Sequence, residues 1–272
     1  MEREGTSGRL MTRAPSMHRV VALAALLAGL SVAALPLGGC ASTPVAVDAP
    51  PRPATFAILA RHAPETRAPA AVAASDLVGR VGETRTLAVV AGREAGERRT
   101  QRVAESADGT VAIEESTRAG LERSVLRPRE DGGYTLLSVD TPGEDSRSAF
   151  ADGLEFARPS LAPGEASESA SPMRVTLLSS GKERAKGSST RTQRITGSAD
   201  IDVCGERLVA TVVETVFVAS LDAAKARRES EIFVVPSRGI VAERWREKVT
   251  VLGIFPKTTE ETVVVVPTKG TP

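Results

Sequence analysis

From about Gly82 onward, hydrophobic and β-branched residues recur in short runs that glycine-rich or polar turns separate. Asp108-Gly109 is typical of a hairpin turn, because both residue types tolerate positive φ angles. The runs predict strands at Thr84–Ala91, Arg98–Glu105, Thr110–Arg118, Leu121–Leu126, Tyr134–Asp140, Met173–Ser179, Ser188–Thr196, Ala199–Cys204, Glu206–Ala219, Glu229–Val235, Ile240–Leu252 and Thr258–Val266. Strand lengths and turn spacing predict an all-β fold: a curved antiparallel sheet, forming a half-barrel or two packed sheets.

The run Ile240–Leu252 shows the clearest alternation of side chains. Trp245 shares one face with valines and glutamates, whereas Arg244 and Arg246 lie on the other face. This pattern predicts a core tryptophan and a solvated face whose arginines pair with glutamates of the preceding strand, such as Glu231, at about 0.2–1 kcal/mol per pair. A platform for a sugar or phosphate, built on the tryptophan and its flanking arginines, is the alternative.

Two segments interrupt the strand pattern. Ala41–Ser75 is rich in proline and alanine and is predicted to be a tether, in which Thr55–His62 is an edge strand, one helical turn or plain linker. The segment 141–172, with four prolines, is predicted to be a long loop and a possible internal boundary. The expected organisation is a signal peptide, a lipidated cysteine with its Pro/Ala-rich linker, and a β-rich domain, at 1–39, 40–81 and 82–272.

An apolar segment, Val20–Leu35, follows several arginines and precedes the sequence Leu37-Gly38-Gly39-Cys40. The segment is shorter than the roughly 20 residues that a membrane-spanning helix needs, and small residues before the cysteine suit cleavage by a peptidase. This layout resembles the type II signal peptide of bacterial lipoproteins. The resemblance implies that a signal peptidase recognises Leu37, Gly38 and Gly39, and that Cys40 carries a diacylglycerol and usually a further acyl chain such as palmitate.

An ordinary signal peptide and an uncleaved anchor helix are the alternatives for this segment. Two or three acyl chains suffice for stable anchoring, so we expect a lipid-anchored protein of the bacterial cell envelope. Ala41 follows Cys40, and enterobacterial sorting rules then imply the periplasmic face of the outer membrane rather than the inner membrane. The expected partners are the membrane, an envelope protein or a lipid ligand.

Charge and histidine content narrow the function classes. A formal net charge of +1 provides no electrostatic footprint for nucleic acid, so no nucleic-acid partner is expected. The chain has two histidines, and His18 leaves with the predicted signal peptide. A Ser–His–Asp or Cys–His mechanism would therefore need His62, which lies in the predicted linker. We expect no enzyme, no catalytic residue, no His/Cys metal site and no cofactor.

Cys204 and two adjacent glutamate pairs are the remaining candidates for chemistry. If the other cysteine carries lipid, Cys204 has no disulfide partner and is predicted to be a small, partly buried residue at a strand end. Glu114-Glu115 and Glu260-Glu261 place neighbours on opposite faces of a strand, so neither pair converges as a general acid and base. All four glutamates are predicted to be surface charges.

The segment Ile232–Glu243, with the turn Pro236-Ser237-Arg238-Gly239, is similar to the closing hairpin of certain bacterial envelope β-domains. These include uncharacterised periplasmic and lipoprotein domains and resemble the lipoprotein-localisation carriers of the LolA/LolB type, which have an open, curved antiparallel sheet. No binding residue is carried over from this resemblance. The favoured function is a non-catalytic structural or interaction role at the envelope, and a carrier that holds an apolar or lipid ligand on the concave face is the alternative.

Overall fold

The computed structural model describes residues 53–267 and contains two small helical elements, α1 (Ala74–Val78) and the 3-10 turn η2 (Pro142–Glu144). All other regular structure is strand. The strands are β1 (Phe56–His62), β2 (Val72–Ala73), β3 (Thr84–Gly92), β4 (Arg98–Glu105), β5 (Val111–Thr117), β6 (Gly120–Pro128), β7 (Tyr134–Thr141), β8 (Ser146–Ala157), β9 (Ser160–Leu161), β10 (Ala166–Leu177), β11 (Glu183–Val203), β12 (Glu206–Leu221), β13 (Ala224–Val235), β14 (Gly239–Val251) and β15 (Phe255–Val266).

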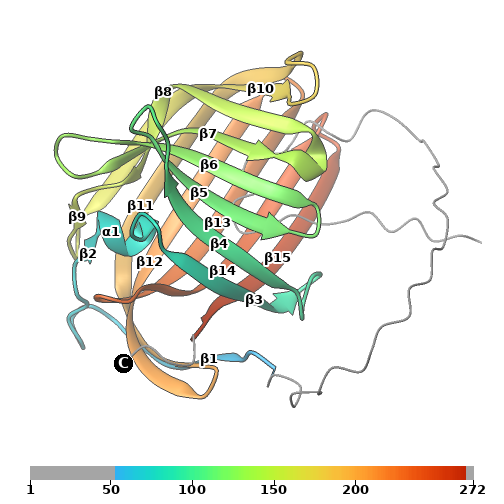
Figure 1. The fold of residues 1–272 in the computed structure, drawn as a ribbon. Coiled ribbons are helices and arrows are strands. Elements are labelled where there is room, and N and C mark those ends of the chain that lie inside the picture. Colours follow the sequence, from blue (N-terminus) through green and yellow to red (C-terminus); the bar gives the residue numbers. More distant parts are fainter. Residues whose placement is uncertain (1–52, 268–272) are drawn as a thin grey trace, which may run out of the picture.

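Twelve of these strands form a closed antiparallel barrel (Figure 1). Their order is β11-β10-β8-β7-β6-β5-β4-β3-β15-β14-β13-β12, and β12 pairs back onto β11 to complete the ring. β1 is an extra strand at the edge of β11. The predicted all-β fold with a curved antiparallel sheet is confirmed, and the curvature is sufficient for closure.

Side chains along the barrel strands alternate between the interior and the outside. In β13, Ala226, Arg228 and Ser230 are buried, whereas Arg227 and Glu229 between them are exposed. Inward-facing valine, leucine, isoleucine and phenylalanine side chains from successive strands form the main core. Since the same inward rows carry arginine and glutamate, the barrel interior is a core of mixed chemistry.

A short segment closes one end of the barrel. β2 pairs with β9, and α1 follows with Leu77 and Val78 buried. The helix contacts β13 and β14 as well as β8, which lies several strands away around the ring, so it spans the opening (Figure 1). The Ala73 N–H donates to Asp76 Oδ2 at 3.1 Å and caps the first turn. Within residues 53–267, no helix has the length and apolar character that crossing a membrane requires.

A second core lies outside the barrel, where β1 and the end of the β11–β12 hairpin pack on the outer faces of β13, β14, β15 and β3. The ring of Phe56 meets that of Phe233 edge-on, with centroids 5.1 Å apart. Gly197 permits the approach of β1, since a Cβ there would lie 2.3 Å from the His62 carbonyl oxygen. The predicted linker at 40–81 is therefore ordered structure from Phe56 onward, and its edge-strand alternative is confirmed.

Two sequence-based predictions of local structure are wrong. The predicted long loop at 141–172 holds β8, β9 and most of β10. The two separate strands predicted at Ser188–Thr196 and Ala199–Cys204 are parts of one continuous strand, β11. Small and polar side chains argue against a strand when a segment is considered alone, but here they fit the barrel interior, where Ser167, Ser171 and Ala226 are buried.

The wall between β8 and β10 also departs from a regular ladder. Backbone pairing covers only Met173–Leu177 of β10. Farther along, Ser171 Oγ accepts a hydrogen bond from the Asp152 N–H at 3.1 Å, and Ser169 Oγ accepts one from the Glu155 N–H at 3.0 Å. Serine hydroxyls thus replace backbone partners beside a proline-containing strand. This stretch, 151–157 of β8 facing 166–172 of β10, is termed the serine seam.

Candidate functional site

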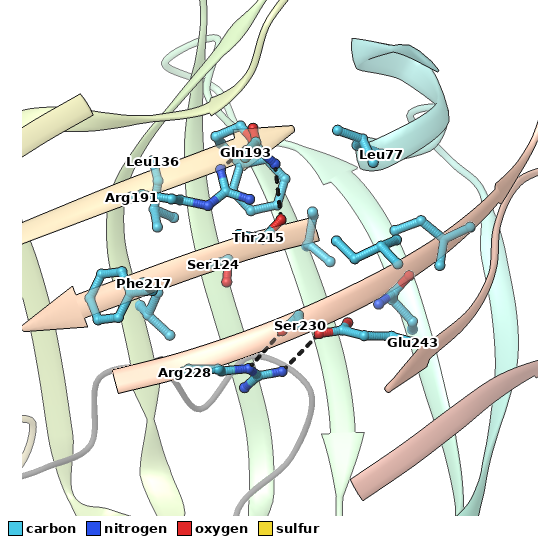
Figure 2. A pocket seen from close by; sticks show the side chains of 16 residues that line it. Leu77, Ser124, Leu136, Arg191, Gln193, Thr215, Phe217, Arg228, Ser230 and Glu243 are labelled. Carbon is cyan, nitrogen blue, oxygen red and sulfur yellow. Dashed lines mark hydrogen bonds and ion pairs between the residues drawn. The ribbon is translucent and has the colours of Figure 1, made fainter. Parts of the chain in front are cut away.

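The barrel encloses a cavity of about 110 Å³, which α1 borders (Figure 2). Apolar side chains in its lining include Leu77, Leu136 and Phe217. Charged and amide side chains reach it from β11, β13 and β14, namely Arg191, Gln193, Arg228 and Glu243. Such a volume has room for a few water molecules or one small ligand, because a single water needs about 10–15 Å³.

Arg191 extends from β11 to the serine seam. Its Nη1 donates to the carbonyl oxygen of Glu155 at 2.8 Å and also to that of Phe156, and its guanidinium lies 4.6 Å from the centroid of the Phe156 ring. Gln193 lies beside it. When its amide is assigned so that both atoms are paired, the oxygen is 2.9 Å from Arg191 Nη2 and the nitrogen 3.0 Å from the Phe156 carbonyl. Burial lowers the pKa of Arg191 to about 10, so the side chain stays charged at neutral pH. Arg191 therefore supplies hydrogen-bond donors to β8 where β10 does not.

Arg228 forms the second polar arrangement at the cavity (Figure 2). Its Nη2 donates to Glu243 Oε1 at 3.0 Å and its Nε donates to Ser230 Oγ at 3.3 Å. The guanidinium also lies 4.3 Å from the centroid of the Trp245 ring. Trp245 is 1% exposed, which confirms the prediction of a core tryptophan. A carboxylate and an aromatic face together stabilise the buried cation.

A third arrangement, termed the Arg99 cluster, lies in the same interior. The Arg99 side chain is 0% exposed, and its guanidinium contacts the carboxylates of Glu94 at 2.7 Å, Glu97 at 3.4 Å, Glu115 at 3.4 Å and Glu261 at 3.0 Å. Burial raises the pKa of Glu115 to about 7 and also raises the pKa of Glu261. Several carboxyls share one cation, so the cluster can hold a proton near neutral pH.

The two adjacent glutamate pairs are divided between inside and outside. Glu115 and Glu261 belong to the Arg99 cluster, whereas Glu114 and Glu260 lie outside, each paired with an arginine of a neighbouring strand. The prediction of opposite faces is confirmed. The prediction of four surface charges is wrong, because the inner face of a closed barrel has no solvated side.

The other predicted residues lie away from the cavity. Cys204 is partly buried at the β11–β12 turn, at the edge of the external core, as predicted. His62 ends β1, and its Nε2 lies 3.0 Å from Asp200 Oδ2. Arg67 binds the other oxygen of Asp200 at 2.8 Å, so these contacts attach the chain after β1 to β11. The predicted lipidation and peptidase residues lie outside the described residues: Cys40, Leu37, Gly38 and Gly39.

Sequence reasoning missed Arg99, Arg191 and Arg228, the arginines around which the interior is arranged. The signal that identifies such residues is the alternation itself. Arg228, for example, shares its face of β13 with Ala226 and Ile232. An arginine in phase with small and apolar residues of a strand is a candidate for an interior ion pair.

The chain matches no protein-family model, no curated protein and no solved structure at a significant level. The protein is a closed twelve-stranded barrel with one capped end, a core that contains charged side chains, and a small amphiphilic cavity. Within the part of the chain that the structure describes, no group of three or more His, Cys, Asp or Glu side chains is arranged to hold a metal ion.

Proposed function

We propose that this chain is a lipid-anchored bacterial envelope protein whose barrel has a non-catalytic structural or interaction role. The observation that supports this role most is that the charged side chains of the barrel interior bind one another or the backbone. Arg99 is bound by carboxylates, Arg228 by Glu243, and Arg191 by backbone carbonyls. Buried ion pairs and hydrogen bonds that link several strands in this way favour one arrangement of those strands.

Two observations support the anchor. The sequence Leu37-Gly38-Gly39-Cys40 resembles the cleavage site of a lipoprotein signal peptide, and the segment between Cys40 and the barrel is short. The chain from Cys40 to Pro53, the first described residue, spans at most about 45 Å even when fully extended. β1 then attaches the chain firmly to the barrel. A lipid on Cys40 thus keeps the barrel at the membrane surface, and the expected membrane is the outer one, on its periplasmic side.

Ligand binding is the second candidate, and the amphiphilic lining of the cavity favours it. A closed sheet offers its interior rather than an open concave face. At about 110 Å³ the cavity is smaller than the roughly 300 Å³ at which ordinary ligand pockets begin, so it suits a small amphiphile better than a lipid with two acyl chains. Arg191 and Arg228 would meet the anionic end of such a molecule, and Phe217 its apolar part.

Substitution of the two cysteines tests the anchor. The full chain, C40S and C204S are produced in a bacterium that processes lipoproteins, then compared by detergent-phase partitioning and intact mass. Wild type and C204S are expected to enter the detergent phase with the added mass of the lipid on Cys40, and C40S to lack that mass. A wild-type protein without lipid mass, or a C40S protein with it, contradicts the proposal.

Native mass spectrometry of the extracted protein separates the two candidate roles. A stoichiometric protein partner supports the interaction role. A small bound molecule that R191L releases and the exposed-site control R194L retains supports the ligand-binding role.

A further inference from the structure

The turn between β14 and β15 concentrates exposed hydrophobic side chains. Leu252 is 57% exposed, Ile254 69% and Phe255 62%. They are three of the seven large hydrophobic residues that are exposed in the described part of the chain. Scattered exposed hydrophobic residues need no explanation, but a contiguous group on one protruding turn marks an interaction site. This turn, Leu252–Phe255, is termed the apolar tip.

The apolar tip projects beyond its neighbouring strand. β15 pairs with β3 only from Glu261 onward, where its partner Gly92 ends β3. The preceding part of β15, from Phe255 to Glu260, therefore extends past β3, and most of it is exposed. The turn at the end of this hairpin is therefore accessible to a binding partner or a membrane.

The backbone of the apolar tip is unusual for its sequence. Leu252 has a φ angle of +51° and Gly253 one of +73°, the left-handed pair that tight hairpin turns require. Glycine, asparagine or aspartate normally fills such a position, and a leucine there is strained. The Leu252 N–H donates to the Ala223 carbonyl at 2.9 Å, which holds the turn in place. A hydrophobic residue that is both strained and exposed does not stabilise the fold, so it indicates a contact with another molecule.

The charges beside the apolar tip are mainly positive. Lys225 on β13 pairs in register with Thr250, and Lys248 and Lys257 lie on the two strands of the hairpin itself. The adjacent β12–β13 turn contributes Asp222. Three lysines and one aspartate thus surround a group of hydrophobic side chains, an arrangement that complements anionic lipid headgroups.

We propose that the apolar tip inserts into the interface of an anionic lipid bilayer, with the lysines at its headgroups. The inference rests on the proposed function, because a lipid on Cys40 would hold the barrel within about 45 Å of the bilayer and raise the local concentration of the tip at its surface. Three side chains on one turn are far fewer than the roughly 20–30 residues a side of a stable protein interface, whereas they match shallow insertion into a bilayer.

Tryptophan fluorescence of the full lipidated protein in vesicles tests the proposal. F255W places a probe at the tip, and V81W places one at a residue that is 53% exposed near α1. The buried Trp245 contributes a constant background. In phosphatidylglycerol–phosphatidylethanolamine vesicles with brominated acyl chains, the F255W probe is expected to shift to the blue and to be quenched at least about twofold more than the V81W probe. Equal quenching of both overturns the proposal, and so does a blue shift at F255W without quenching, which indicates a protein occupant.

L252N separates a membrane role from a structural one. Asparagine tolerates the left-handed conformation, so the midpoint of urea unfolding is expected to hold or rise. Quenching of the F255W probe in the L252N background is expected to fall by about half or more, since an apolar group is lost from the interface. Unchanged quenching contradicts the proposal. The two proposals can be contradicted separately. If the tip does not insert, quenching at F255W is low while the lipid mass on Cys40 is still present. If the anchor is absent, the lipid mass is missing.

Discussion

Arg99 Nη1 lies 3.4 Å from Glu115 Oε1 inside the barrel, and both side chains are completely buried. The pKa of Glu115 is nevertheless raised by burial to about 7 from an ordinary value of 4.5. One cation does not offset the loss of water here, because Arg99 also binds Glu261, Glu97 and Glu94. A buried carboxyl with a raised pKa makes the folding free energy depend on pH.

The first prediction concerns stability between pH 4.5 and 7. In this window the native state holds the Glu115 proton and the unfolded chain releases it, so the contribution is full below about pH 4.5 and is lost as the pH rises through about 7. The loss amounts to at most about 3–4 kcal/mol, by the linkage of about 1.4 kcal/mol per pKa unit. Urea unfolding of E115Q at several pH values is expected to lack this decline.

E114Q is the matched control, since Glu114 lies outside the barrel on the same strand. It is expected to keep the wild-type pH profile. Carboxyls such as Glu155 act in the opposite direction: burial opposes ionisation, yet hydrogen bonds from Ser167 and Arg129 lower the pKa of Glu155 overall. Their contribution is lost in acid, so maximal stability is expected at mildly acidic pH. An E115Q profile identical to wild type contradicts the prediction.

Loss of the central cation should be costly. R99M leaves carboxylates buried without their arginine, and an uncompensated buried charge costs about 3–5 kcal/mol. R98M, at the exposed neighbour on the same strand, should change the unfolding free energy by less than about 0.5 kcal/mol. Urea titration of both variants measures the difference, and equal stability of the two disproves the role assigned to Arg99.

The serine seam should open when Arg191 is removed. R191L takes donors from the carbonyls of Glu155 and Phe156, at an expected cost of about 2–4 kcal/mol. Amide hydrogen exchange should accelerate at 151–157 and 166–172 more than in the rest of the barrel. The control R194L changes an exposed arginine on the same strand as Arg191 and breaks its pair with Glu214 of β12. It should leave the seam protected. Uniform acceleration throughout the barrel would disprove the local role.

Attachment of β1 should depend on Phe56, the aromatic residue that it contributes to the core outside the barrel. F56A removes the contact with Phe233, and because Phe56 is only partly buried the expected cost is about 2–3 kcal/mol. Trypsin cleavage at Arg61, followed by mass spectrometry, should become faster. L59A is the control, since Leu59 on the same strand is 51% exposed, and its cleavage rate should equal that of wild type. Equal rates for both variants would show that β1 is held by other contacts.

The pattern of side chains predicted most strands well. The predicted strand at Arg98–Glu105 coincides with β4, and the expected exposure of Arg244 and Arg246 around a buried Trp245 is observed. Of the expected cross-strand pairs, Glu231 meets Arg244. The serine seam could not be predicted in the same way, because its serine hydroxyls and Arg191 act across strands whose pairing is set elsewhere in the sheet.

The sequence by itself determined where strands run and which residues share a face, because the two-residue period of a strand is a local property of the backbone. It also contains the cysteine on which the predicted anchor depends. Only the tertiary structure decided which face of each strand turns inward. That choice brings Glu115 and Glu261 into contact with Arg99. Arg99 and Glu261 are 162 positions apart, and they converge because the C-terminal strand β15 pairs with β3, which also pairs with β4. Closure depends on the register between strands that are far apart in the sequence. Once the sheet is closed, one side of every barrel strand faces the interior.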